Sequence, residues 1–181
     1  MRPTAISALL AVLALAIVLP APASALDCTP FQSWTCSQQG YFNYLDGVPG
    51  EVLCGVDYTG WTLHVVEVTV AQAGYFQFSA TTGIAFATTT TTAVMLMDDC
   101  AAGTCVSSAQ GNSVTDLGVC LDAGTYTFVV ASQTTLPTAI VNMGFACLTC
   151  AQAEAYELDC PYCGTVGNDS TDWGSLKLQY R

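Results

Sequence analysis

The chain has 181 residues, of which 52% are hydrophobic and only 9% are charged, and it contains ten Cys and one His. Beyond residue 25, two basic residues face 14 acidic ones, which leaves a formal charge of −12. Such a chain has almost no side chain that could neutralise phosphate, so the composition excludes a nucleic-acid-binding protein and electrostatic docking on anionic lipid.

The first 25 residues have the pattern of a cleaved secretory signal. Arg2 supplies a positive charge, residues 6–19 form a run of apolar and small residues, and Ala-Ser-Ala at 23–25 supplies a cleavage site. The apolar run is shorter than the roughly 20 residues that span a membrane as a helix. We therefore expect residues 1–25 to be removed on export and the mature chain to begin at Leu26.

All ten Cys lie in the predicted mature chain, and an even number in an exported protein predicts a disulfide framework. Most of the connectivity cannot be deduced from the spacing. Cys100 and Cys105 bracket a four-residue loop, so we expect these two to pair with each other. The complete set is Cys28, Cys36, Cys54, Cys100, Cys105, Cys120, Cys147, Cys150, Cys160 and Cys163.

Strand patterns fill the middle of the chain. From Thr62 to Val70 apolar residues alternate, with His64, Val66, Val68 and Val70 on one face. Residues 71–74 predict a turn, residues 122–125 predict a tight hairpin, and the threonine run 88–92 is expected in an exposed strand or loop. Further strands are expected at 75–80, 93–97, 114–121, 126–132 and 139–147, with weaker candidates at 41–45 and 52–58.

Short strands separated by turn signals predict an all-β sandwich. The expected organisation is a signal peptide at 1–25, a Cys-containing N-terminal flank at 26–51, the β-sandwich at 52–147, and a Cys-rich C-terminal flank and tail at 148–181. Seven of the ten Cys lie in residues 26–54 and 147–181. We therefore expect disulfides to staple both flanks to the sandwich.

Two segments share a form in which a turn ending in Ala-Gly precedes an aromatic strand: residues 70–78 and residues 121–129. This order resembles the bacterial pre-peptidase C-terminal domain, whose marks are a strand like Met95-Leu96-Met97-Asp98 and a late hairpin like Ala123-Gly124-Thr125-Tyr126. The resemblance covers about residues 52–147, although the Cys content departs from the family pattern. It implies a jelly-roll-like antiparallel β-sandwich that serves as a non-catalytic binding or secretion module and has no catalytic residues.

The paired Cys motifs near the C-terminus allow two kinds of chemistry besides disulfides. Cys160-Pro161-Tyr162-Cys163 is the dithiol motif of glutaredoxins, but residues 164–170 lack the helical pattern that would stabilise a thiolate. Cys147, Cys150, Cys160 and Cys163 together could hold zinc. Because exported proteins meet oxidising conditions, we favour disulfides at all four positions.

The chain is not expected to require a cofactor. Two clusters of oxygen ligands make calcium a better candidate than zinc. The twelve-residue calcium loop is absent, so we favour solvated acidic turns over calcium ligands as the interpretation of these clusters. The residues concerned are Asp98 and Asp99 in one cluster, and Asn168, Asp169 and Asp172 in the other.

No catalytic constellation is visible in the sequence. His64 is the only histidine, it lies on the apolar face of a strand, and no G-x-S-x-G motif accompanies it. We therefore do not expect an enzyme.

Several aromatic residues could line a sugar- or peptide-binding face or simply pack in the core: Trp34, Trp61, Trp173, Tyr41, Tyr44 and Tyr58.

The segment 173–181 holds both basic residues of the mature chain, Lys177 and Arg181, beside Trp173 and Tyr180. It is interpreted as either the last strand of the sandwich or a tail that binds a partner.

Three functional hypotheses follow. The chain is a secreted binding or display module for an extracellular protein or polysaccharide, a self-assembling structural subunit, or a secreted metal protein or enzyme using the Cys cluster or an acidic pair. All three place it outside the cell or in the cell envelope, the periplasm included, with no membrane span after signal cleavage.

Overall fold

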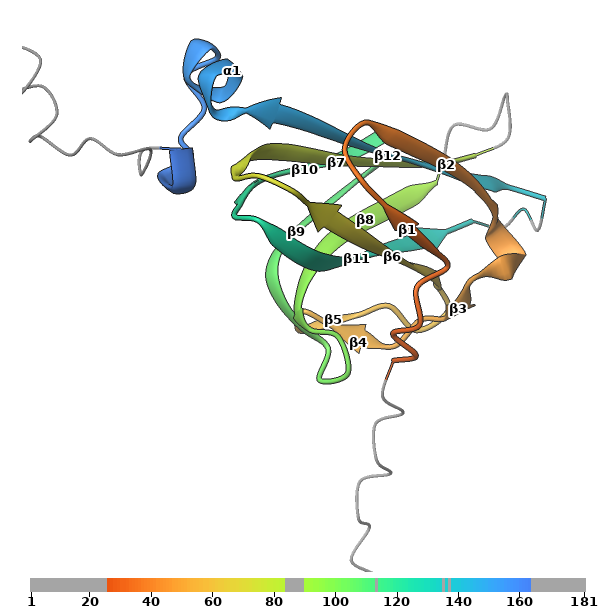
Figure 1. The fold of residues 1–181 in the computed structure, drawn as a ribbon. Coiled ribbons are helices and arrows are strands. Elements are labelled where there is room, and N and C mark those ends of the chain that lie inside the picture. The colour runs from red at the N-terminus through yellow and green to blue at the C-terminus, as the bar shows by residue number, and fades with distance from the viewer. Residues whose placement is uncertain (1–25, 84–89, 113, 135, 137, 164–181) are drawn as a thin grey trace, which may run out of the picture.

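Alternating apolar residues build two of the long strands at the bounds that the sequence predicts. In the computed structural model, which describes residues 26–83, 90–112, 114–134, 136 and 138–163, Thr62–Val70 forms β6 and Val114–Leu121 forms β10, each with its predicted bounds. The strands form two facing sheets, and a short helical segment lies at one end (Figure 1). Among the described residues no helix is long and apolar enough to cross a membrane.

The first sheet, sheet 1, has the strand order β1-β6-β11-β8-β9, with β3 paired to β6. Its strands are antiparallel except for the pair β1–β6, which is parallel. Besides β6, the sheet contains β1 (Gln32–Trp34), β3 (Val48–Pro49), β8 (Thr91–Asp99), β9 (Thr104–Asn112) and β11 (Gly124–Gln133).

The second sheet, sheet 2, is antiparallel and has the order β10-β7-β12-β2. Strand β2 follows β1 in the chain, so the predicted N-terminal flank supplies strands to both sheets. The other members of sheet 2 are β2 (Gln38–Asn43), β7 (Gly74–Gly83) and β12 (Ile140–Thr149). The remaining elements are the small hairpin β4 (Val52–Leu53) and β5 (Val56–Asp57), the 3-10 turns η1 (Tyr44–Asp46) and η2 (Pro161–Cys163), and the helix α1 (Cys150–Ala155).

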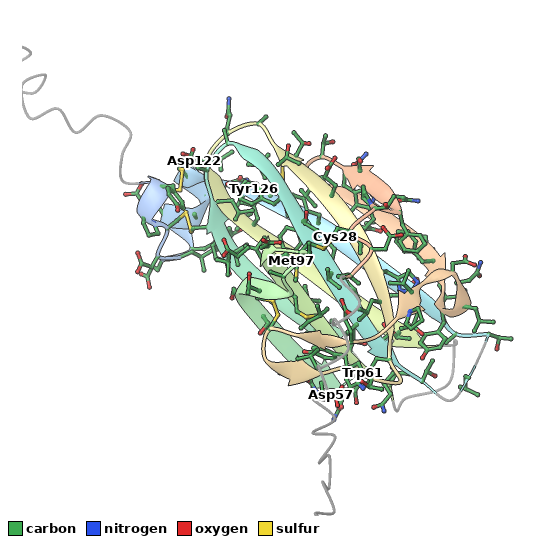
Figure 2. All side chains as sticks on the ribbon, turned by 90° about the horizontal axis from the view of Figure 1, so that it is seen from below. Cys28, Asp57, Trp61, Met97, Asp122 and Tyr126 are labelled. Atoms are coloured by element: carbon green, nitrogen blue, oxygen red, sulfur yellow. A yellow bond between two sulfur atoms is a disulfide. The ribbon has the colours of Figure 1, made fainter. Side chains whose placement is uncertain are left out.

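The predicted hairpin at 122–125 is wrong. Strand β10 pairs with β7, whereas β11 pairs with β6 and β8, so this tight connection passes from one sheet to the other. The connection β6–β7 does the same in the opposite direction. The hydroxyl of Tyr126 donates to the carbonyl oxygen of Asp122 at 3.0 Å and fixes this corner at the end of the sandwich that carries the C-terminal flank (Figure 2).

The main core lies between the two sheets and is rich in stacked aromatic rings. Phe78 and Phe128 face each other from opposite sheets, with ring centroids 4.6 Å apart and planes 12° from parallel. Trp34 also stacks on Phe78, with ring centroids 5.8 Å apart. Both phenylalanines are fully buried, and burial of such a side chain stabilises a fold by about 1.5–3 kcal/mol.

A second core covers the outer face of sheet 1. Residues 26–28 and 50–61 form an N-terminal layer, and its Leu53 and Tyr58 pack on that face. Strands β6, β8 and β11 are therefore buried on both faces: in β11, Phe128 enters the main core and Val129 enters the second core. This explains why residues 93–97 and 128–131 are continuously apolar. Trp61 and Asp57 lie at one end of the molecule, and Tyr126 lies toward the other end (Figure 2).

Five disulfides connect all ten Cys, and they confirm that both flanks are stapled to the sandwich. The predicted pair Cys100–Cys105 is wrong. The N-terminal layer lies against that loop and supplies a partner to each, giving Cys28–Cys100 and Cys54–Cys105. The remaining bonds are Cys36–Cys147, Cys120–Cys160 and Cys150–Cys163. All five Cα–Cα distances, between 4.9 and 6.0 Å, suit a disulfide.

The threonine run does not lie wholly on the surface, contrary to expectation. Thr90 and Thr92 are buried, and Thr92 belongs to a group of hydroxyls at one end of the main core. Its hydroxyl donates to that of Thr82 at 3.3 Å, and Thr82 and Ser132 are joined at 2.7 Å. Threonine is tolerated here because each buried hydroxyl has a hydrogen-bond partner. Residues 88 and 89 lie outside the described part of the chain.

Candidate binding site

The outer face of sheet 2 is an exposed surface of uncharged polar residues. Strand register places these side chains in rows across all four strands, because alternate residues of each strand point to the same face. One row is Tyr41, Asn142, Thr81 and Val114, and the next is Gln39, Gly144, Ser79 and Asp116. The two rows beyond are Ala146, Gln77 and Gly118, followed by Leu148, Tyr75 and Cys120.

The middle of this face is hollow because its central residues are small. A pocket of about 280 Å³ lies over Gly144 and Ala146, and its walls include the side chains of Gln39, Gln77 and Ser79. A Cβ at position 144 would lie only 3.2 Å from the Ser79 hydroxyl oxygen, so a larger residue would fill the hollow. Each amide wall carries both donors and acceptors.

Tyrosines stand on two sides of the hollow. Tyr41, on the edge strand β2, is 71% exposed, whereas Tyr75 lies across the face over Gly118. The only charged side chain in the four rows is Asp116, on the opposite edge strand β10. This face therefore offers hydrogen bonds and aromatic surface with very little charge.

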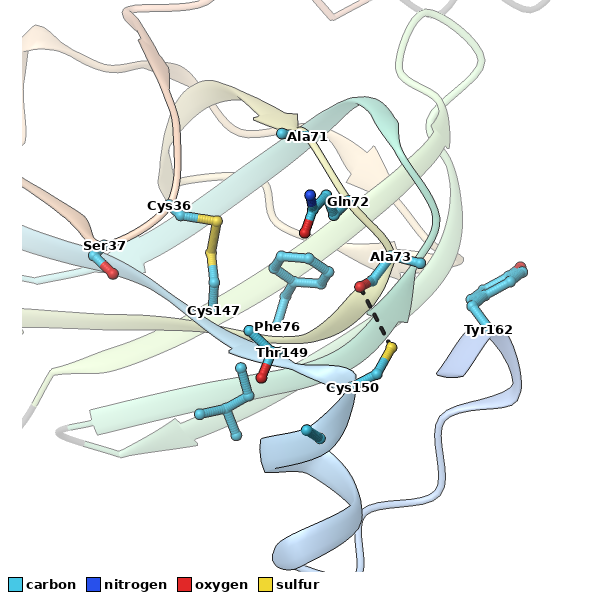
Figure 3. A pocket seen from close by; sticks show the side chains of 12 residues that line it. Cys36, Ser37, Ala71, Gln72, Ala73, Phe76, Cys147, Thr149, Cys150 and Tyr162 are labelled. Atoms are coloured by element: carbon cyan, nitrogen blue, oxygen red, sulfur yellow. Dashed lines mark hydrogen bonds between the residues drawn. A yellow bond between two sulfur atoms is a disulfide. The ribbon is translucent and has the colours of Figure 1, made fainter. Parts of the chain in front are cut away.

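A larger apolar groove lies at the end of the sandwich, and we call it the end groove (Figure 3). Its volume is about 740 Å³, and Phe76 forms part of its floor. The loop 71–73, the end of β12 and the start of α1 supply its walls, with Tyr162 of η2 on the far side. None of the described residues that line it is charged.

Helix α1 is positioned at this groove by local chemistry. Thr149 caps the helix, because its hydroxyl accepts from the backbone N–H of Gln152 while the Gln152 side chain accepts from the Thr149 N–H. The disulfide Cys150–Cys163 then ties the helix to η2. The disulfide Cys36–Cys147 ties β12 to the turn that follows β1. The rim of the end groove is thus held by two disulfides.

Of the aromatic residues expected on a binding face, only Tyr41 is placed on one. Trp34, Tyr44 and Tyr58 are buried in the two cores, and Trp61 packs against the second core. Trp173 lies outside the described residues. Sequence reasoning missed the glutamines and glycines of sheet 2, since solvent-facing polar residues show no signal until strand register aligns them.

His64 is a structural residue rather than part of an exposed site. It is fully buried at the end of the main core, with its ring 5.5 Å from Phe31 and 5.7 Å from Phe42. Its Nε2 lies 3.2 Å from the carbonyl oxygen of Asn43, and its Nδ1 has no partner. Burial lowers the pKa of His64, although the Asn43 carbonyl and Asp46 oppose that shift. The imidazole is therefore neutral, with its proton on Nε2.

The candidate metal ligands do not come together in the part of the chain that is described. All four Cys of the suggested zinc site are in disulfides, so the structure contradicts a four-thiolate site. Asp99 accepts from the backbone N–H of Ala102 at 3.0 Å and serves its own turn. No group of three or more His, Cys, Asp and Glu among the described residues is placed to bind a metal ion. Asn168, Asp169, Asp172 and the tail residues Trp173, Lys177, Tyr180 and Arg181 lie outside these residues.

The strand order and the two faces define a disulfide-stapled β-sandwich of jelly-roll-like form. No family model and no curated protein matches the sequence. Among solved structures, the fold is similar to the pre-peptidase C-terminal domain of collagenase from Bacillus anthracis, with a TM-score of 0.41 and 10% identity over 63% of this chain and 92% of that one.

Two further solved structures are similar at lower TM-scores. The enzymatically active domain of tailspike protein 4 from bacteriophage CBA120 has a TM-score of 0.33 and 15% identity, covering 62% of this chain and 18% of that one. The C-terminal CBM6 of LamC from Zobellia galactanivorans has a TM-score of 0.31 and 13% identity, covering 59% of this chain and 99% of that one. Similarities at this level carry no argument about function.

Proposed function

We propose that this protein is a secreted, non-catalytic module that binds a neutral polysaccharide on the outer face of sheet 2. The observation that carries the proposal is the hollow over Gly144 and Ala146, bordered by Gln39, Gln77 and Ser79. Sugar hydroxyls both donate and accept hydrogen bonds, and amide and hydroxyl side chains match them in both roles. The exposed ring of Tyr41 offers an apolar surface with a polar tip beside that hollow.

The charge of the protein narrows the class of polysaccharide. The described residues include no Lys or Arg, so an acidic polysaccharide would find no opposite charge among them. A cationic polysaccharide would find one carboxylate, Asp116, in the four rows of this face. An uncharged chain suits a face whose other side chains are amides, hydroxyls, aromatic rings and small apolar groups.

The five disulfides support a site of action outside the cytosol, since disulfides persist in oxidising compartments. Together with the predicted signal peptide, they support export to the cell envelope or the medium. A durable module that holds a polysaccharide needs neither a cofactor nor a catalytic group.

The test is a sedimentation assay in which the chain from Leu26 is mixed with a panel of insoluble neutral polysaccharides, with calcium and with a chelator. We expect one or more of the panel to retain the protein in both conditions. Tyr41→Ala should weaken retention by about tenfold, the effect of truncating a central aromatic contact. Tyr156→Ala is the matched control, because Tyr156 is 68% exposed but follows α1. Retention by none of the panel, or equal loss in both variants, would contradict the proposal.

A further inference from the structure

The end groove is a preformed apolar site that adjoins the proposed polysaccharide face, since Ser37 lines both the groove and the hollow. Its floor residue Phe76 is buried and stacks on Phe145 with centroids 5.5 Å apart, so the floor is held by the main core. Its rim is fixed by Cys36–Cys147 and Cys150–Cys163. A volume of about 740 Å³ lies within the roughly 300–1,000 Å³ of sites that hold a drug-sized group.

The chain itself carries a segment of suitable composition that follows, in sequence, the last residues lining this groove. Tyr162 lines the groove, and the chain continues from Cys163 through ten further residues to Trp173. Ten residues reach at most about 35 Å when extended, which exceeds the dimensions of the groove. From Trp173 onward the sequence is Trp-Gly-Ser-Leu-Lys-Leu-Gln-Tyr-Arg, with four large apolar residues in nine.

Charge complementarity favours the same occupant. The groove is uncharged, but the flank beside it exposes the acidic residues Glu154, Glu157 and Asp159. Lys177 and Arg181 are the only basic residues beyond residue 25. A segment that places Trp173 or Leu176 in the groove brings Lys177 near this acidic flank. Ion pairs between solvent-exposed charges contribute modestly, so the apolar contact supplies most of the affinity.

We infer that the chain's own segment 173–181 docks in the end groove, with its apolar side chains in the groove and its basic side chains beside the acidic flank. Covalent connection favours this occupant over a free ligand, because a short tether keeps the segment at a high effective concentration around the groove. The end groove shares Leu148 with the outer face of sheet 2 but includes none of Gln39, Gln77 and Ser79, so docking there leaves these walls of the hollow uncovered.

Trypsin tests this inference directly, because cleavage after Lys177 needs an accessible extended segment. The substrate is the oxidised chain that begins at Leu26, and cleavage is followed by intact-mass spectrometry beside a free peptide of residues 170–181. We expect cleavage of the chain to be at least tenfold slower than that of the peptide. Ala73→Trp, which fills the groove, and the tail variant Trp173→Ser/Leu176→Ser should each restore the peptide rate.

Controls separate docking from other sources of protection. Ala102→Trp adds the same ring on the exposed loop between β8 and β9 and should leave cleavage slow. Ala151→Trp fills the groove from α1 and covers the case in which Ala73→Trp does not fold, as judged by near-ultraviolet circular dichroism. Cleavage at the peptide rate in the unmodified chain, or protection that neither groove-filling variant removes, would overturn the inference. Protection that grows with protein concentration would also overturn it, since a neighbouring copy would then be the occupant.

Discussion

Tyr75 lies across Gly118 so closely that a Cβ at position 118 would be 1.8 Å from the Tyr75 hydroxyl oxygen. Glycine at this position of β10 thus lets the phenol ring of β7 lie over the outer face of sheet 2, on the far side of the hollow from Tyr41. The pair shows that the face depends on missing side chains as much as on those present.

Gly118→Ala should therefore impair binding without impairing the fold. The added methyl group meets only the free end of the Tyr75 side chain, which can rotate away, so we expect the free energy of unfolding to change by less than about 1 kcal/mol. Displacing the ring should cost binding on the order of 1 kcal/mol, or about fivefold in affinity. Chemical denaturation and sedimentation with polysaccharide measure the two effects. A loss of stability with unchanged affinity would show that Tyr75 does not contribute to binding.

The buried His64 predicts a loss of stability on mild acidification. Its pKa is lowered in the folded protein by burial, whereas in the unfolded chain it is near 6.5. Below about pH 6.5 the unfolded state binds a proton that the folded state rejects, so the free energy of unfolding should fall, by up to about 1.4 kcal/mol per pH unit. Above that pH this contribution is fully present.

Urea unfolding at a series of pH values between 5 and 7 measures this effect. His64 is the only histidine, and carboxyl groups titrate mainly below this window. His64→Gln retains a donor for the Asn43 carbonyl but has no proton to gain, so its stability should be lower at neutral pH and flat across the window. A variant that keeps the slope would show that another group titrates there.

The disulfides predict unequal losses when pairs are replaced. Cys28→Ser/Cys100→Ser frees the N-terminal layer and opens a loop of 72 residues, and should lower the free energy of unfolding by roughly 2–5 kcal/mol. Cys150→Ser/Cys163→Ser opens a separation of 13 residues on the C-terminal flank, outside both cores, and should cost less. Denaturation of the two variants measures both. Peptide mapping without reduction that links Cys100 to Cys105 would contradict the connectivity.

The cluster of buried hydroxyls predicts that removing one of them lowers the free energy of unfolding and that removing its partners as well restores part of it. Thr82→Val keeps the side-chain shape but removes a hydrogen-bond partner from both Ser132 and Thr92, which are fully buried. The free energy of unfolding should fall by about 1–3 kcal/mol. Replacing all three hydroxyls, as Thr82→Val/Ser132→Ala/Thr92→Val, should recover part of that loss. Three independent, additive losses in thermal or chemical denaturation would show that these hydroxyls do not act together.

The strand patterns predicted much of the sandwich because alternation in segments such as Thr62–Val70 directly reflects burial. Strand β9 escaped prediction, since its half-buried positions hold small or polar residues such as Ser107 and Ala109 rather than large apolar ones. The second core was not foreseen either. The unbroken apolar runs in β8 and β11 are the sequence feature that reflects it. Such runs do not reveal which segment of the chain covers the second face of the strand.

The candidate sites depend on relationships that no local pattern contains. Gln39, Gln77 and Gly144 come from three strands and meet only through pairing register. The end groove exists because Cys36 reaches Cys147 and Cys150 reaches Cys163, and ten Cys leave such pairings open from the sequence. Of the six aromatic residues that the sequence offered for a binding face, Tyr41 is the one that the described part of the structure places there.

The most direct test of the proposed function is a binding isotherm for the best polysaccharide of the panel at low and at high salt. Gln77→Ala removes one wall of the hollow, whereas Gln110→Ala removes an exposed strand glutamine from sheet 1. We predict tighter binding for the unmodified protein and Gln110→Ala than for Gln77→Ala, with affinities that do not change with salt because the ligand is uncharged. Equal affinities for the two variants, or binding that salt abolishes, would contradict a neutral polysaccharide on the outer face of sheet 2.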